Sequence, residues 1–293
     1  MGAIIRGVAV SQDAKVRSSI AHAAAAGRAC IAAAGVEPRE IGLLINCGVY
    51  RDDNMLEPAM AALIQRELGL GLDPTKHPGE KTVLSFDLMN GACGVLNAVQ
   101  VAGAFLASGG VDHVLIVASD AHPSNQDHPS FPYANMGGAM LLGRGEREGA
   151  GLGRLAVRAS AGGPRGVEGY LRFGPRGRVD VTVEREPGYA ERLGELAAAT
   201  VRDYVEAERL DLRETLLVTS QPSPDFAARL AGRLGLGEGA ALSVSGVTGE
   251  PHSAALMLGY HQALARGLLQ RFAQVLFVAA GAGLSCACAI YRP

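Results

Sequence analysis

The 293-residue sequence contains no tryptophan, no excess of one charge and no long run of apolar residues. Its 27 basic and 29 acidic residues are mixed along the chain, and this balance excludes nucleic acid and anionic membranes as favoured partners. No run of about 18 apolar residues would span a membrane, and residues 1–6 lack the apolar core of a signal peptide. We therefore expect a cytoplasmic protein that does not bind membranes.

Cysteine is also sparse, because the chain has five cysteines and no CxxC pair. Cys286 and Cys288 lie in an alternating pattern that predicts a strand, so both side chains point to one face. This spacing favours neither a disulfide nor a metal site. We expect reduced cysteines and no metal or other cofactor.

Glycine, in contrast, is abundant, with 39 residues in a chain that is still 48% hydrophobic, which indicates tight turns in a folded core. One order of elements (strand, helix, strand, helix, strand, helix, strand, strand) is predicted twice. The first set is 3–10, 14–34, 42–47, 57–68, 83–87, 93–106, 113–119 and 139–142, and the second is 155–160, 186–206, 215–219, 225–234, 241–244, 250–265, 274–280 and 285–291. The pattern predicts two duplicated α/β halves, 1–143 and 154–293. Residues 73–81 and 122–136 read as loops, and 144–153 as a linker.

A cysteine stands at the start of a predicted helix. The strand at 83–87 breaks at Asn90-Gly91, and apolar residues then recur at helical spacing after Cys93. A helix N-terminus stabilises a thiolate, so this position predicts a pKa below the free value of about 8.5. Cys93 is therefore a candidate nucleophile, although a buried packing cysteine fits the same pattern.

The duplication predicts where other polar groups gather. Ligands of open α/β sheets bind beyond the carboxyl ends of parallel strands. Cys93, Ser220, Glu250 and the glycine turn at 281–283 follow such ends, and we expect them to meet in one pocket.

With these motifs the sequence resembles the thiolase superfamily, and most closely its β-ketoacyl-acyl-carrier-protein synthase III branch. The similar segments span nearly the whole chain and are 86–94, 110–120, 137–139, 249–255 and 281–285. The resemblance implies a thiolase fold, in which two βαβαβαββ halves form an αβαβα sandwich. It also implies that Cys93 accepts an acyl group and that the backbone N–H groups of Cys93 and Gly283 form the oxyanion hole.

Residues 50–52 and 56–58 are similar to the branch that joins two acyl chains head to head. In that branch the glutamate of the Leu-Glu-Pro element reaches the partner's active site across a dimer interface. The resemblance therefore implies a dimer in which Glu57 takes part in catalysis.

Two residues that assist catalysis in the family are replaced in this chain. Ser220 stands at the position of the family's histidine and Glu250 at that of its asparagine, and His252 lies two residues after Glu250. An ionised Glu250 cannot donate a hydrogen bond to a developing enolate, so ordinary malonyl condensation is not expected unless burial keeps Glu250 neutral. Glu250, Glu57 or His252 could instead act as a general base, while Ser220 is a weaker candidate.

The family's coenzyme A clamp is also missing, since only a short segment separates the first predicted strand from the first helix and the chain has no tryptophan. We expect acyl groups to arrive on an acyl carrier protein, or from acyl-coenzyme A with help from a partner. The first hypothesis is an acyltransferase of specialised or fatty-acid-like biosynthesis that passes an acyl group from Cys93 to a carbon or heteroatom nucleophile. The alternative is a catalytically reduced subunit that pairs with a related ketosynthase in a heterodimer.

Overall fold

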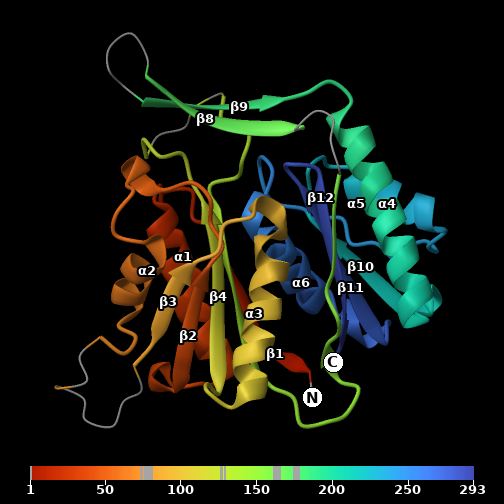
Figure 1. Ribbon diagram of the computed structural model, residues 1–293, viewed down its shortest axis with the longest axis horizontal. Coiled ribbons are helices and arrows are strands. Elements are labelled where there is room, and N and C mark those ends of the chain that lie inside the picture. Colours follow the sequence, from red (N-terminus) through yellow and green to blue (C-terminus); the bar gives the residue numbers. More distant parts are fainter. Residues whose placement is uncertain are drawn as a thin grey trace.

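The computed structural model describes residues 2–72, 75, 82–125, 128, 130–160, 166–173 and 179–293. Within these residues, two five-stranded β-sheets are separated and flanked by helices, and a two-stranded sheet lies apart from them (Figure 1). The predicted polar loop at 73–81 lies outside the described residues except for Thr75. Positions 126, 127 and 129 of the predicted loop 122–136 are outside them as well.

The first sheet has five strands in the order β1-β5-β4-β2-β3. Strand β2 runs parallel to β3 and β4, and β5 is antiparallel to β1 and β4. The elements of this half are β1 (Ala3–Ser11), α1 (Ser19–Ala34), β2 (Ile41–Asn46), α2 (Met60–Leu68), β3 (Leu84–Asp87), α3 (Gly94–Ser108), β4 (His113–Asp120) and β5 (Met136–Arg144).

The second sheet has the order β10-β11-β12-β6, and β7 also pairs with β12. Strands β10 and β11 are parallel, whereas β11 and β12 are antiparallel. The elements of this half are β6 (Gly151–Leu152), β7 (Ala156–Ala159), β8 (Val167–Phe173), β9 (Val179–Arg185), α4 (Tyr189–Glu208), β10 (Thr215–Thr219), α5 (Phe226–Leu234), α6 (Ala255–Ala265), β11 (Gln274–Gly281) and β12 (Ser285–Arg292).

Five layers follow from the alternation of apolar side chains on the buried strands. In β2, Leu43 and Ile45 pack into the central layer, whereas Leu44 faces the outer helices. Helices α3 and α6 lie between the sheets, α1 and α2 cover the outer face of the first sheet, and α4 and α5 cover the outer face of the second (Figure 1). The predicted αβαβα sandwich is confirmed.

Strand β5 needs its two glycines because helices press on both of its faces. A Cβ atom at Gly137 would lie 2.8 Å from the backbone carbon of His22 in α1. A Cβ atom at Gly138 would lie 2.8 Å from the Cβ of Met257 in α6. The sequence predicted that the strand starts at residue 139, after both glycines. The observed strand begins at Met136, so both glycines lie inside it.

Two predicted helix starts were wrong. Helix α1 begins at Ser19 after the N-cap residue Ser18, whose hydroxyl accepts the N–H of Ala21 at 3.0 Å, and Asp52 accepts the N–H of Ser19 at 2.7 Å. Helix α2 begins at Met60, and Asp87 accepts the N–H groups of its first two residues at 3.0 and 2.8 Å. Capping of α2 by an acceptor from another element leaves no local sequence signal.

The predicted strand at 241–244 was also wrong. Only Ala241 makes an isolated bridge, to Leu217, among the described residues there. The predicted linker contains a short strand, β6, whose Leu152 pairs with Tyr291.

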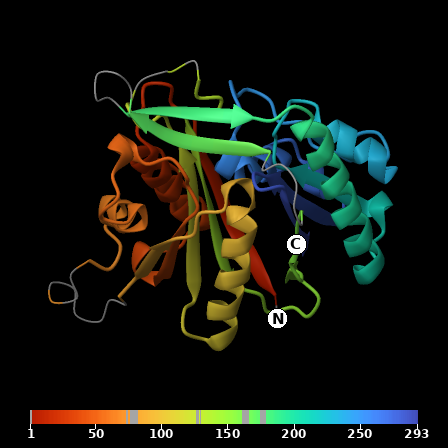
Figure 2. The ribbon, with the colours of Figure 1, turned by 45° about the horizontal axis from the view of Figure 1, so that its top comes forward.

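A hairpin formed by β8 and β9 was not predicted. It pairs antiparallel, with Gly169 opposite Val183, and lies across the top of both halves (Figures 1 and 2). Val181 of β9 is buried, and Ser130 donates a hydrogen bond to the Val181 carbonyl at 3.0 Å. The hairpin therefore covers the end of the sheets where the candidate site lies.

The segment 91–108, which includes α3, is long and apolar enough to cross a membrane by length and composition. Half of it is buried inside the fold, and core helices meet the same criterion.

Candidate active site

Cys93 ends a 3-10 turn (Gly91–Cys93) directly before α3, and its side chain is fully buried. Its Sγ lies 3.5 Å from the Ser285 hydroxyl and 3.5 Å from the Ala279 carbonyl oxygen. The glycine turn packs on the same 3-10 turn, because a Cβ atom at Gly281 would lie 3.2 Å from the Cβ of Ala92. The cysteine and the glycine turn are thus brought together.

The predicted low pKa of Cys93 was wrong. Burial raises the pKa of the thiol above its ordinary value, and the hydrogen bond with Ser285 only partly opposes this effect. Desolvation penalises a thiolate more than the helix start stabilises it. The resting cysteine is therefore a thiol that must be deprotonated to react.

His252 lies beside the cysteine turn. The turn Gly91–Cys93 and a second 3-10 turn, His252–Ala254, contact each other. The ring stacks on Tyr133 with centroids 4.0 Å apart, and its Nε2 lies 3.6 Å from where a Cβ of Gly91 would be. Nδ1 bonds to Asp120 Oδ2 at 2.8 Å, while Nε2 has no hydrogen-bond partner within the described part of the chain. One ring nitrogen is thus anchored and the other is open.

Asp120 anchors this histidine from the end of β4. It is 1% exposed and accepts hydrogen bonds from the Ser253 hydroxyl at 2.6 Å and from the backbone N–H groups of Val49 and Tyr50 at 3.0 and 3.1 Å. Burial alone would raise the pKa of Asp120, but the charge of His252 and these hydrogen bonds lower it to about 2. Asp120 is therefore a fixed buried anion.

The same pair sets the protonation of the histidine. Burial alone would lower the pKa of His252, but the charge and hydrogen bond of Asp120, with the charge of Glu250, raise it above its ordinary value. Asp120 fixes the tautomer by binding Nδ1. The pair has the geometry of a general acid and base that Asp120 orients.

Glu250 is held in an ion pair with Arg185, the last residue of β9. Its side chain is 12% exposed, and its backbone pairs with the loop at Tyr133. Burial raises the pKa of Glu250, although His252 and Arg185 oppose this effect. The carboxylate is thus close to His252 but tied to a cation.

Ser220 lies at the end of β10 but has a structural partner. Its hydroxyl accepts from the Ala280 N–H at 2.8 Å and donates to the Ala280 carbonyl at 3.0 Å. Gly283 lies in the neighbouring turn with a φ of +76°, and a Cβ atom there would meet open space. These contacts join β10 to the glycine turn and leave the Ser220 hydroxyl fully engaged.

Glu57 is not part of this cluster. It is exposed ahead of α2, and no described residue forms a hydrogen bond or an ion pair with its side chain. Its neighbour Leu56 is 82% exposed. Within one chain, Glu57 is therefore separate from the other candidates.

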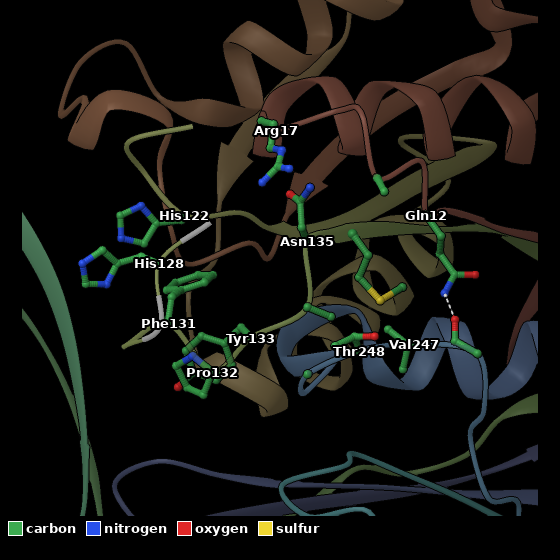
Figure 3. Close-up of a pocket in the computed structure, with 15 residues that line it drawn as sticks. Gln12, Arg17, His122, His128, Phe131, Pro132, Tyr133, Asn135, Val247 and Thr248 are labelled. Carbon is green, nitrogen blue, oxygen red and sulfur yellow. Dashed lines mark hydrogen bonds between the residues drawn. The ribbon is translucent and has the colours of Figure 1, made fainter. Parts of the chain in front are cut away.

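Two cavities flank the contact between Pro132 and Gly249, which line both. The larger, of about 480 Å³, is lined by Arg17, His122, Asn135 and Tyr133, among others, and its lining within the described residues includes no carboxylate (Figure 3). The Arg17 and Asn135 side chains point towards each other, while His122 and His128 stand to one side (Figure 3).

The smaller cavity, of about 290 Å³, is lined by Arg185, Glu250 and Gln221, among others. Cys93 lines neither cavity. Tyr133, which stacks on His252, lines the larger cavity, and Glu250 lines the smaller one.

Several neighbours of the site were not recognised as such in the sequence. They are Asp120, Tyr133, Arg185 and Ser285. Asp120 carries the clearest signal, because Ser119 and Asp120 end a strand whose residues 114–118 are all apolar. Among the described residues, no three histidine, cysteine, aspartate or glutamate side chains come together as metal ligands.

Comparisons with known proteins agree on one group. Residues 208–293 match the family described as 3-oxoacyl-[acyl-carrier-protein (ACP)] synthase III C terminal. The chain is 26% identical over 268 residues to β-ketoacyl-[acyl-carrier-protein] synthase III of Yersinia pestis (strain Pestoides F), an alignment that covers 88% of this chain and 79% of the relative.

Two solved structures show the fold. The chain is similar to 3-oxoacyl-(acyl carrier protein) synthase III of Pseudomonas aeruginosa PAO1, with a TM-score of 0.79, 19% identity and coverage of 100% and 98% of the two chains. It is also similar to OleA of Xanthomonas campestris, with a TM-score of 0.78, 18% identity and coverage of 99% and 96%.

The Asp120–His252 pair predicts a specific pH dependence of stability. The lowered pKa of Asp120 contributes stability above its unfolded pKa of about 4, and this is lost as pH falls towards 2. The raised pKa of His252 contributes stability that is complete below about pH 6.5 and is lost as pH rises through the folded pKa. We expect urea unfolding to show greater stability at about pH 5.5 than at about pH 8.

Asp120→Asn removes the charge but keeps the shape, so it should lower the pKa of His252, measured by NMR of the ring protons, below its ordinary value. It should also reverse the His252 contribution, so that this contribution favours the fold at about pH 8 over about pH 5.5, because a buried histidine with a lowered pKa opposes protonation in the folded state. An unchanged histidine titration in Asp120→Asn would contradict the pairing.

Proposed function

We propose that the protein is an acyltransferase of the thiolase superfamily that works through Cys93, because the proteins it is similar to in sequence and fold are synthases of the ketoacyl synthase III type. The observation that carries this proposal is the open Nε2 of His252, oriented by Asp120 and packed beside the cysteine turn. A buried thiol of raised pKa needs a base, and His252 supplies one.

The proposed cycle begins with transfer of the Cys93 proton to His252. The thiolate attacks the carbonyl carbon of an acyl thioester, and the thiol of acyl carrier protein or coenzyme A leaves with a proton. The backbone N–H groups of Cys93 and Gly283 hold the oxyanion, in the way that the family resemblance implies. A second substrate, a carbon or heteroatom nucleophile, then loses its proton to His252 and takes the acyl group.

The structure favours His252 over Glu250 and Ser220 as the acid and base. The Glu250 carboxylate is paired with Arg185, and the Ser220 hydroxyl is engaged at Ala280. Of these three side chains, only His252 has a fixed orientation and also an atom, Nε2, that is left without a partner among the described residues.

A dimer would complete the site with Glu57. Strand β3 is an edge strand of the first sheet, and its Leu84 is 51% exposed. An exposed apolar edge is a ready pairing surface. We infer that β3 pairs with a second copy, which places Glu57 near the partner's cysteine, and that the assembly is a cytoplasmic dimer.

A catalytically reduced partner subunit is the second candidate. The full burial of Cys93, its raised pKa and the loss of the family's histidine favour this alternative. In that case the chain would shape the pocket of a related ketosynthase.

The covalent step is tested by intact-mass spectrometry after incubation with acyl thioesters of coenzyme A and of acyl carrier protein. We expect one acyl group on the wild type and none on Cys93→Ala. Cys30→Ala is the matched control, because Cys30 is equally buried but lies in α1, and it should keep the adduct. A wild type that takes no acyl group from any donor would reject the enzyme and favour the partner subunit.

The choice of base is tested by comparing two glutamine variants. His252→Gln should lower kcat by about 10²–10⁴-fold, the usual contribution of a general acid or base. Glu250→Gln keeps the size of the side chain and should lower kcat by less than about tenfold, since ion pairing already occupies Glu250. The opposite ranking would assign the role to Glu250.

The shared site is tested by mixing two inactive variants. Glu57→Gln alone should impair turnover and, like the wild type, give twice the 30.3 kDa chain mass by light scattering. A random mixture of Cys93→Ala and Glu57→Gln subunits should recover about a quarter of wild-type activity, because half of the dimers are mixed and each has one complete site. A mixture without recovery, or a monomeric wild type, would contradict the crossing of Glu57.

A further inference from the structure

The sulfur of Cys93 has two hydrogen-bond partners of different kinds. Its Sγ lies 3.5 Å from the carbonyl oxygen of Ala279 and 3.5 Å from the hydroxyl oxygen of Ser285. A carbonyl oxygen can only accept a hydrogen bond, whereas a hydroxyl can accept one or donate one. In the described part of the chain, Ser285 is the only side chain that hydrogen-bonds to this sulfur. The Ala279 carbonyl therefore suits only the thiol, and Ser285 suits both the thiol and the thiolate.

Ser285 has another partner that its hydroxyl can release. The hydroxyl donates a hydrogen bond to the Ala282 carbonyl, three residues back in the glycine turn, at 3.1 Å. The hydrogen of a hydroxyl rotates about the C–O bond to suit its partners. Once Cys93 has lost its proton, the sulfur can only accept hydrogen bonds, so rotation of this hydrogen exchanges a neutral acceptor for a charged one. Hydrogen bonds to a charged group are about twice as strong as neutral ones.

Strand pairing on both sides holds Ser285 beside the sulfur. Ser285 is the first residue of β12 and lies opposite Gly281 of β11 and Ala159 of β7. Successive side chains of a strand point to opposite faces, so Ser285 shares a face with Ala287, two residues further on. Ala287 packs in the central layer with Cys93. The alternation of the strand therefore directs the Ser285 hydroxyl towards the sulfur.

The surroundings of the sulfur make this hydrogen bond important. Cys93 is fully buried, Ser285 is half-buried, and Ala282 and Gly283 are exposed. Burial raises the pKa of the Cys93 thiol, and the hydrogen bonds with Ser285 and with the backbone of Ala287 oppose this effect only in part. A hydrogen bond inside a protein is electrostatically stronger than one in water. A buried thiolate therefore depends on the few donors that the protein itself supplies.

We propose that Ser285 is a further catalytic residue, whose hydroxyl donates a hydrogen bond to the Cys93 thiolate. The inference rests on the proposed function. When His252 takes the proton from the sulfur, the Ser285 hydrogen rotates from the Ala282 carbonyl to the sulfur, and Ser285 keeps its own proton. The same hydrogen bond stabilises the sulfur when the acyl group passes to the second substrate and the thiolate leaves. The thiolate then takes up the proton that His252 removed from the second substrate.

The hydrogen bond is tested by the pH dependence of the alkylation of Cys93 with iodoacetamide, followed by peptide mass spectrometry. This reaction needs the thiolate but no oxyanion hole, so it reports on the sulfur and not on the shape of the glycine turn. In Ser285→Ala the rising limb of the rate should shift to higher pH by about 0.5–1 unit, because a hydrogen bond to the thiolate is lost. At a fixed pH, the acyl-enzyme should form about 3–10-fold more slowly in the same variant.

Two further variants separate this role from a structural one. Ser285→Thr keeps the hydroxyl and should restore the wild-type dependence on pH. Ser108→Ala is the matched control, because the Ser108 hydroxyl also donates to the carbonyl three residues back, at 2.8 Å, but lies at the opposite end of α3 from Cys93. This variant should also keep the wild-type dependence.

A Ser285→Ala protein with the wild-type pH dependence would overturn the role of Ser285 and leave the proposed acyltransferase standing. A Ser285→Thr protein that shifts as far as Ser285→Ala would also reject the role of the hydroxyl. The expected shift without an acyl-enzyme from any thioester would reject the acyltransferase and retain Ser285 as the donor to the thiolate. A Cys93 that takes no iodoacetamide at any pH would overturn both.

Discussion

One buried carboxylate joins the two halves of the molecule at the candidate site. Asp120 ends a strand of the first half, and it binds His252 and Ser253 in the turn before α6 of the second half. It also accepts the N–H groups of Val49 and Tyr50. A buried anion is tolerated only when its oxygens are paired, so these segments are all constrained by the same oxygens.

The charges of the site then fall into two pairs with different tasks. Asp120 with His252 leaves one imidazole nitrogen open beside the cysteine turn, whereas Arg185 and Glu250 form an ion pair that lines the smaller cavity. The hydroxyl of Ser220 is engaged in two hydrogen bonds with the backbone of Ala280. In the proposed cycle the acid and base chemistry therefore lies in the turn before α6 and not at the end of β10.

The hairpin of β8 and β9 forms the outer wall of this site. It supplies Arg185, and the residues at its two ends, Gly166 and Tyr189, pack against each other. In the described part of the chain, it pairs with neither of the two main sheets. Its position over the sheet ends is set by side-chain contacts, such as those of Val181 and Ser130.

The sequence by itself determined two α/β halves whose central strands are buried on both faces, because the continuous apolar runs of β2 and β11 are local signals of such burial. The five-layer sandwich was expected from the family resemblance. The sequence also placed Cys93 at the start of α3 and predicted that the glycine turn would meet it. No equally strong local signal marked the start of α2, which Asp87 caps from another strand, or the hairpin of β8 and β9.

Only the tertiary structure decided the chemistry around the cysteine. The pKa of Cys93 depends on how deeply the thiol is buried, and the roles of His252, Glu250 and Ser220 depend on which distant groups bind them. How deeply a side chain is buried, and which groups bind it, depends on residues that lie far apart in the chain and meet only in the folded protein. The sequence pattern of one segment therefore cannot predict the burial or the hydrogen-bond partners of these side chains.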